Sequence, residues 1–335
     1  MPKTVLLTGI TGFIAKRIAY DLLKAGHSVV GSVRTPGRED EVRAAVTPEG
    51  DADAAERLRF VTLDLNTDAG WAEAMAGIDV LMHTASPFPL SNPKDESEII
   101  RPAVDGTMRA LKAAQETGVR RVILTSSVVA IMHVDRPEGH LYGPEDWTDI
   151  GHPTASAYIK SKTLAERAAW DFVQEAPIDL TTIHPGLVLG APRDGKYGSS
   201  LEVVERILGG KDPALPELGF PVVDVADVSH LHVAAMERPE TIGKRIIAAG
   251  EWATMPGLAR ILKEVYPDRK IATRIAPKLL MRVLALFDAE IRTVLPQVGR
   301  RTPMDNAETH EIFGIDFIPP RDALLASAQA ILAQA

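Results

Sequence analysis

Short apolar runs alternate with amphipathic stretches through the first half of the chain. The apolar runs are rich in valine, isoleucine and leucine, as expected of strands buried on both faces of a sheet. The amphipathic stretches repeat their apolar residues at helical spacing. This alternation predicts an α/β fold with a doubly wound parallel sheet covered by helices on both faces. The predicted strands are residues 5–8, 28–33, 58–63, 79–83, 119–125 and 180–184, and the predicted helices are residues 13–25, 71–76, 95–117 and 156–175.

The pattern changes after His184. Proline and glycine become frequent over residues 185–221, which indicates loops. Residues 35–57 are charged and rich in alanine, so we expect a helix with a loop there. The second half therefore predicts a smaller C-terminal lobe, part of which returns to the sheet. Its predicted strands are residues 222–224 and 245–248, and its predicted helices are residues 226–237, 256–265, 277–292 and 321–333.

A glycine-rich turn joins the first predicted strand to the first predicted helix. It reads Gly-x-x-Gly-x-x-Ala from Gly9 to Ala15. Gly9 allows the tight turn, Gly12 lets the backbone approach a pyrophosphate, and Ala15 lets the helix pack closely on the strand. The helix N-terminus adds free N–H groups and the positive end of its dipole. We therefore predict a Rossmann-type dinucleotide site whose turn consists of Gly9, Thr11, Gly12, Phe13 and Ile14.

The end of the second strand bears on which nicotinamide cofactor binds. A carboxylate at that position accepts the ribose 2′-hydroxyl of NAD. Here no acid follows the strand until Glu39, whereas Arg34 can pair with a 2′-phosphate and Arg38 can assist. This arrangement favours NADP(H). The alternative is that Arg34 is a solvated charge at the end of the strand.

Further candidates follow the third and fourth strands and precede a later helix. Asp64 and Leu65 are candidates for the adenine end of the cofactor, although an aspartate there also suits a turn or a helix cap. Ligands gather at the carboxyl ends of such strands, which makes the sequence Thr84-Ala85-Ser86 a candidate too. Ser199 precedes a helical run. Its hydroxyl either caps that helix or bonds a phosphate of the cofactor.

Two hydroxyl-bearing segments predict proton chemistry at a carbonyl group. Tyr158 and Lys162 are four residues apart, so they share one helix face. An ammonium beside a phenol favours the phenolate, so we expect Lys162 to lower the pKa of Tyr158. The sequence Thr125-Ser126-Ser127 ends an apolar strand and offers a hydroxyl for a substrate carbonyl oxygen.

Together these motifs resemble the extended short-chain dehydrogenase/reductases, within the dihydroflavonol-reductase-like branch that includes microbial aldehyde and carbonyl reductases. The resemblance is good over residues 3–250 and loose in the tail. It implies that Tyr158 is the general acid, that Lys162 lowers its pKa and holds the nicotinamide ribose, and that Ser127 binds the carbonyl oxygen, with Ser126 as the alternative serine. The segment resembling the family's nicotinamide wall is Pro185, Gly186, Leu187 and Val188.

The resemblance also implies a division of the chain and a type of substrate. We expect residues 1–184 to form the NADP-binding Rossmann domain, with residues 222–249 returning to it. Residues 185–221 and 250–335 would then form the substrate-binding lobe. The flavonoid-contacting asparagine of plant dihydroflavonol reductases is missing from Ala130–His133, and the cinnamoyl-CoA reductase signature is absent around Tyr158. We therefore expect a compact, fairly apolar aldehyde, ketone or alcohol as substrate, and a monomer or homodimer.

Composition and residue spacing argue against several other kinds of site and partner. The chain has 335 residues, a net charge of −8 and no cysteine. The negative charge argues against a nucleic-acid surface, and the missing thiols exclude disulfides and cysteine zinc sites. His230 and His232 are two residues apart and do not share a helix face, so we expect no metal. No apolar run is long enough to span a membrane, and we expect a cytoplasmic protein.

Two other functions remain open on the sequence alone. The first is an NAD-dependent sugar-nucleotide epimerase or dehydratase, which needs a basic patch for UDP. Arg292, Arg300 and Arg301 in the tail could supply that patch. The second is a dinucleotide sensor without turnover, for which an intact set of serine, tyrosine and lysine would be unnecessary.

Overall fold

The computed structural model describes residues 1–87 and 95–334. Within them, a seven-stranded sheet has the order β3-β2-β1-β4-β5-β6-β9, and every neighbouring pair is parallel. This confirms the predicted doubly wound sheet. Its strands are β1 (Thr4–Thr8), β2 (Ser28–Val33), β3 (Leu58–Thr62), β4 (Val80–His83), β5 (Arg121–Thr125), β6 (Asp179–Pro185) and β9 (Arg245–Ala248).

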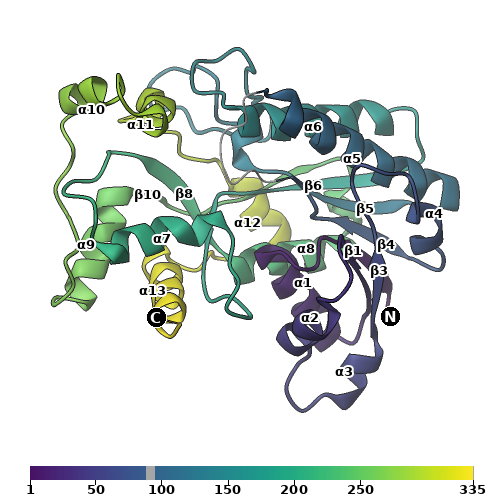
Figure 1. Ribbon diagram of the computed structural model, residues 1–335. Helices are drawn as coiled ribbons and strands as arrows, with labels where there is room; N and C mark the ends of the chain where they lie inside the picture. Colours follow the sequence, from purple (N-terminus) through teal and green to yellow (C-terminus); the bar gives the residue numbers. More distant parts are fainter. Residues whose placement is uncertain (88–94, 335) are drawn as a thin grey trace.

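Helices cover both faces of this sheet because successive strand residues point to opposite sides (Figure 1). Val5 and Leu7 pack with residues of α1 (Phe13–Lys24) and α8 (Val225–Glu237). Leu6, between them in β1, packs on the other face with Trp71 of α4 (Trp71–Ala74) and with α5 (Ser97–Thr117). The helix α6 (Ala157–Val173), which carries Tyr158 and Lys162, lies against α5 on that second face.

The smaller part of the chain is built around a second sheet with its own core. In the order β10-β8-β7, this sheet joins β10 (Trp252–Thr254), β8 (Gly219–Asp224) and β7 (Leu187–Leu189). Residues 222–224 thus lie in the small sheet. In contrast, β9 is a strand of the large sheet, and α8 packs on the face of that sheet. Packed around the small sheet are α7 (Ser199–Gly209), α9 (Met255–Val265) and α13 (Pro320–Leu332).

Two sequence predictions about helices were wrong in detail. The segment 35–57 forms two short helices, α2 (Glu39–Val46) and α3 (Ala52–Glu56). The single helix expected over residues 277–292 is broken into α10 (Lys278–Leu284) and α11 (Ala289–Val294). The chain between them tightens into i to i+3 bonds from Leu286 N–H and Phe287 N–H. The remaining elements are α12 (Ala307–Phe313) and the 3₁₀ turns η1 (Val128–Ala130), η2 (Pro239–Thr241) and η3 (Leu295–Gln297).

Candidate functional site

Two adjoining cavities follow the carboxyl ends of the parallel strands. The first has a volume of about 350 Å³ and lies at the ends of β2 and β3. The second has a volume of about 400 Å³ and lies at the ends of β5 and β6, beside α6 and α7. Gly9 and Gly12 line both cavities, as do Thr84 and Ser86. One continuous site therefore passes over the glycine turn, at the edge where ligands bind in open α/β sheets.

The glycine turn has the geometry that the sequence predicts. Gly9 has φ +68°, and a Cβ atom there would lie 3.0 Å from Ala85 Cα. The hydroxyl of Thr8 accepts the N–H groups of Thr84 and Ala85, 3.1 Å away each, so the turn and the end of β4 are fixed together. Gly12 is the N-cap of α1, without a side-chain capping bond and without an acid in the first turn. The first N–H groups of α1 are thus free for an anion.

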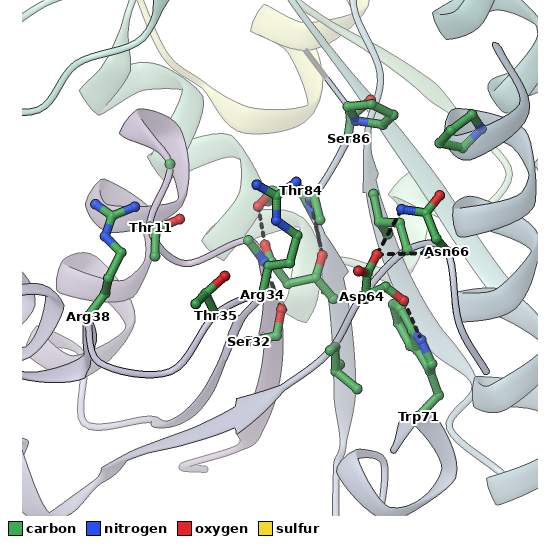
Figure 2. A pocket seen from close by; sticks show the side chains of 18 residues that line it. Thr11, Ser32, Arg34, Thr35, Arg38, Asp64, Asn66, Trp71, Thr84 and Ser86 are labelled. Carbon is green, nitrogen blue, oxygen red and sulfur yellow. Dashed lines mark hydrogen bonds between the residues drawn. The ribbon is translucent and has the colours of Figure 1, made fainter. Parts of the chain in front are cut away.

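The first cavity is lined by polar groups from two strand ends. Figure 2 shows Arg34, Thr35 and Arg38 on one side and Asp64 and its neighbours on the other. Arg34 is exposed. Asp64 accepts hydrogen bonds from the backbone and side-chain nitrogens of Asn66, 2.9 Å each, so it shapes a turn and also lines the cavity. Both sequence interpretations of Asp64 are compatible with this position.

Arg38 already has a partner at the rim of this cavity. Its guanidinium lies 3.1 Å from Glu41, whose carboxylate also accepts a bond from Lys196. The hydrogen bonds from Lys196 and then Arg38 lower the pKa of Glu41 to about 2. Any anion that binds Arg38 therefore competes with a permanently ionised carboxylate.

The second cavity brings together Ser127, Tyr158 and Lys162. Tyr158 and Lys162 lie one turn apart on α6, and Ser127 follows β5 as the N-cap of η1. The Tyr158 hydroxyl and Ser127 are joined by a hydrogen bond. Lys162 Nζ lies 3.5 Å from the carbonyl oxygen of Thr125. Residues 31 positions or more apart in the sequence thus meet in one cavity, as the motifs predict.

The two adjacent serines have different partners. Ser126 lines the second cavity as well, but its Oγ donates to the buried Oε2 of Glu166 at 2.7 Å. Ser127 Oγ contacts Tyr158, and its other contacts, with Pro185 O and Val129 N, are long at 3.4 Å. The hydroxyl available to a substrate is therefore that of Ser127, because a buried carboxylate holds that of Ser126.

The expected effect of Lys162 on Tyr158 is wrong for this structure. Burial raises the pKa of Tyr158 to about 12, and the hydrogen bond from Ser127 offsets only part of that rise. Burial also lowers the pKa of Lys162 to about 8, against the attraction of Glu166. Loss of hydration disfavours the charged form of each group, and it outweighs their proximity. Burial therefore favours the neutral phenol form of Tyr158.

Most of the other predicted residues lie where the sequence suggests. Leu187 is the exception, since it packs into the small core while its neighbour Val188 lines the second cavity. Neighbouring residues of a strand point to opposite sides, so both could not face the site. Ser199 lines the second cavity, but Gly198 is the N-cap of α7 and makes no side-chain cap. The remaining predicted residues that line a cavity are Thr11, Phe13, Ile14, Leu65, Ala85, Thr125, Ser126, Pro185 and Gly186.

Sequence reasoning missed other lining residues because they carry no local motif. Ser32 lies inside β2, and its hydroxyl oxygen accepts a hydrogen bond from Gly9 N–H, 3.0 Å away. Trp71 begins α4, and its indole N–H bonds the carbonyl of Asp64 at 3.3 Å. Tyr197 and Glu202 reach the second cavity from the loop before α7 and from α7 itself. Only the packing of the small part against the sheet brings these last two to the site.

The basic residues that a UDP site would need lie away from the two cavities. Arg292 bonds the carbonyl oxygens of Ala285 and Leu286. Arg300 bonds backbone oxygens and His152. Arg301 lines a separate surface cavity near Trp252. None of the three arginines lines either of the two cavities at the sheet edge.

Two further features concern metals and membranes. Across residues 1–87 and 95–334, no cluster of three or more histidine, aspartate or glutamate side chains has the arrangement of a metal site. His232 is buried, with one ring nitrogen near Thr125 Oγ1 and the other near Val228 O. No helix in the same ranges combines the length and the apolar character needed to cross a bilayer.

Comparison with known proteins gives the family. The NAD dependent epimerase/dehydratase family matches residues 5–250. Cinnamoyl-CoA reductase CAD2 of Medicago truncatula is 32% identical over 279 residues, which are 82% of this chain and 84% of that protein. Dihydroflavonol 4-reductase of Hordeum vulgare is 30% identical over 81% of this chain and 77% of its own.

A solved structure extends the match to the whole chain. Yeast methylglyoxal/isovaleraldehyde reductase Gre2, complexed with NADPH, is 26% identical, with a TM-score of 0.81 over 99% of this chain and 98% of its own. The chain therefore belongs to the NAD dependent epimerase/dehydratase family and, within the extended short-chain dehydrogenase/reductases, to the dihydroflavonol-reductase-like branch, which makes it an NAD(P)-dependent oxidoreductase.

Proposed function

We propose that the protein is an NADPH-dependent reductase of aldehydes or ketones in which Tyr158 is the general acid. The observation that carries this proposal is the meeting of Ser127, Tyr158 and Lys162 in a cavity that also contains the glycine turn. The family supports it, because its similar members include named reductases, and the structures of Gre2 from yeast and from Candida albicans contain NADPH.

The cavities fit such a cofactor. Arg34 and Arg38 in the first cavity would hold the 2′-phosphate, and the uncapped start of α1 would hold the pyrophosphate. Asp64 would lie near the adenine. Lys162 would bond the nicotinamide ribose, with Pro185 among the residues walling the ring. NADPH, when bound, supplies the hydride for the carbonyl carbon.

The chain's own residues would supply the proton and stabilise the charge. As the carbonyl carbon gains a hydride, its oxygen becomes an alkoxide, a stronger base than a phenolate. Tyr158 is protonated at neutral pH and transfers its hydroxyl proton to that oxygen. Ser127 donates a hydrogen bond to the same oxygen, and the ammonium of Lys162 stabilises the resulting phenolate. The product is an alcohol.

A cofactor-resolved screen tests this function. Oxidation of NADPH and of NADH is followed at the dihydronicotinamide absorbance with small aldehydes, ketones and diketones. Tyr158→Phe should keep NADPH affinity and lose at least about a hundredfold in kcat, the usual contribution of a general acid. Tyr142→Phe is the matched control, because the Tyr142 hydroxyl bonds Val134 O outside both cavities. It should retain turnover.

Three results would contradict the proposal. Full activity of Tyr158→Phe would remove the general acid. Tightly retained NAD together with turnover of UDP-sugars would favour the epimerase. Tight NADPH binding without turnover of any carbonyl would favour a sensor.

A further inference from the structure

A carboxylate lies buried directly behind the proposed catalytic residues. Glu166 is one helical turn after Lys162 on α6 and is 1% exposed. Its Oε1 accepts from Arg245 Nε at 2.7 Å and lies 2.8 Å from His184 Nε2. Its Oε2 accepts from Ser126 Oγ at 2.7 Å. Burying an ionised carboxylate costs free energy, and that cost is offset only where cations and hydrogen-bond donors are held in place around it.

Arg245 fixes that position from the far edge of the sheet. It lies on β9, and its Nη1 donates to Pro144 O and Asp146 O at 2.6 and 2.7 Å. Its guanidinium also stacks on the ring of Trp147, 3.7 Å from the ring centroid. Burial raises the pKa of Glu166, but His184 and then the Arg245 cation outweigh this effect and hold that pKa well below its usual range. The carboxylate is therefore ionised and held by rigid elements of the sheet.

We propose that Glu166 is a positioning residue of the reductase, which orients Ser126 so that Ser127 faces Tyr158 and which sets the charge of Lys162 from one turn below. The first action follows from sequence adjacency. Both serines line the second cavity, but Ser126 Oγ is tied to Glu166. Because successive residues of extended backbone point their side chains to opposite sides, this tether directs the Ser127 side chain toward Tyr158. This inference rests on the proposed function.

The second action follows from the charged groups around Lys162. On α6 these are Glu166 and the neutral phenol of Tyr158. From β4 comes His83, whose pKa burial lowers to about 3, so it is neutral. From β5 comes the carbonyl oxygen of Thr125. Glu166 is thus the acid that opposes the effect of burial on Lys162 and keeps its pKa from falling further.

The pH dependence of carbonyl reduction tests the charge effect. The alkaline limb of kcat for NADPH oxidation should follow the loss of the Lys162 proton. Glu166→Gln removes a negative charge near the ammonium, so this limb should move to lower pH by about one unit. Trp170→Phe is the matched control, since it removes a 3.1 Å hydrogen bond to Glu166 and leaves the charge. The alkaline limb of kcat in Trp170→Phe should therefore fall at the same pH as in the wild type.

Ser126→Ala tests the orienting effect separately. It should lower kcat by about tenfold at every pH, the effect of one lost tether at a site that needs sub-ångström positioning. Its alkaline limb should not move. Unchanged kcat in this variant would refute the orienting role.

A double variant guards against misfolding. Glu166→Gln alone leaves Arg245 buried without its carboxylate, so the variant Glu166→Gln/Arg245→Met removes both charges at similar volume. It should show the same downward move of the alkaline limb. A wild-type limb in the folded double variant would overturn the charge role, whereas failure of the wild-type protein to reduce any carbonyl would instead overturn the proposed function.

Discussion

The turn at Gly9 offers a quantitative test of how the backbone builds the nucleotide site. Gly9→Ala adds one methyl group to a residue whose φ is +68°. The new Cβ would lie 3.0 Å from Ala85 Cα and 3.2 Å from Ala85 Cβ. Two costs therefore arise, one from the left-handed backbone and one from contact with a backbone atom that cannot rotate away.

Gly26→Ala separates these two costs. Gly26 has φ +85°, but nothing lies within 4 Å of its Cβ position. It should lose about 1 kcal/mol of unfolding free energy, the backbone cost alone. Gly9→Ala should lose about 2–4 kcal/mol, because overpacking adds about 1–3 kcal/mol. It should also weaken NADPH binding by at least about tenfold, since the N–H groups that begin α1 would be displaced.

Urea denaturation and fluorescence titration with NADPH measure both effects. Stability is compared among the wild type and the two alanine variants at one pH and one protein concentration. If Gly9→Ala matched Gly26→Ala in both stability and NADPH affinity, the close approach of Gly9 to Ala85 would not be what shapes the site. Our account of the glycine turn would then be refuted.

Three other predictions concern charge. Arg34→Ala should weaken NADPH by about tenfold and NADH little, and an equal loss for both in titrations would refute the phosphate assignment. Glu41→Gln should tighten NADPH relative to NADH by freeing Arg38, and an unchanged ratio of dissociation constants would exclude that competition. Burial raises the pKa of Asp227 to about 6, above its unfolded value of 3.8. Its contribution to stability is present below pH 3.8 and is lost as pH rises through 6. Asp227→Asn should therefore flatten the pH dependence of urea stability between pH 3.8 and 6 by about 1 kcal/mol after solvent screening, and an unaltered slope would disprove this.

Local sequence was enough for the elements that depend on near neighbours. The glycine turn was predictable because the conformation of Gly9 and the start of α1 are set within a few residues. The pairing of Tyr158 with Lys162 was predictable because helix geometry puts i and i+4 on one face. The parallel sheet followed from alternating apolar runs, since such strands must be buried on both faces.

Other features depended on contacts that no local pattern contains. The break between α10 and α11 within residues 277–292 and the packing of Leu187 into the small core were both missed by the sequence patterns. The pKa of Tyr158 rises, although a neighbouring ammonium predicts a fall, because the loss of hydration depends on everything that covers the phenol.

The sequence by itself determined that this protein has a dinucleotide turn, a parallel sheet and a tyrosine one helical turn from a lysine. Tertiary structure decided which serine bonds that tyrosine, because Ser126 Oγ bonds Glu166, which pairs with Arg245, 79 residues further along the chain, whereas Ser127 bonds Tyr158. Short-range patterns fix backbone conformation, whereas hydration and charge inside a protein are set by whatever the fold brings near.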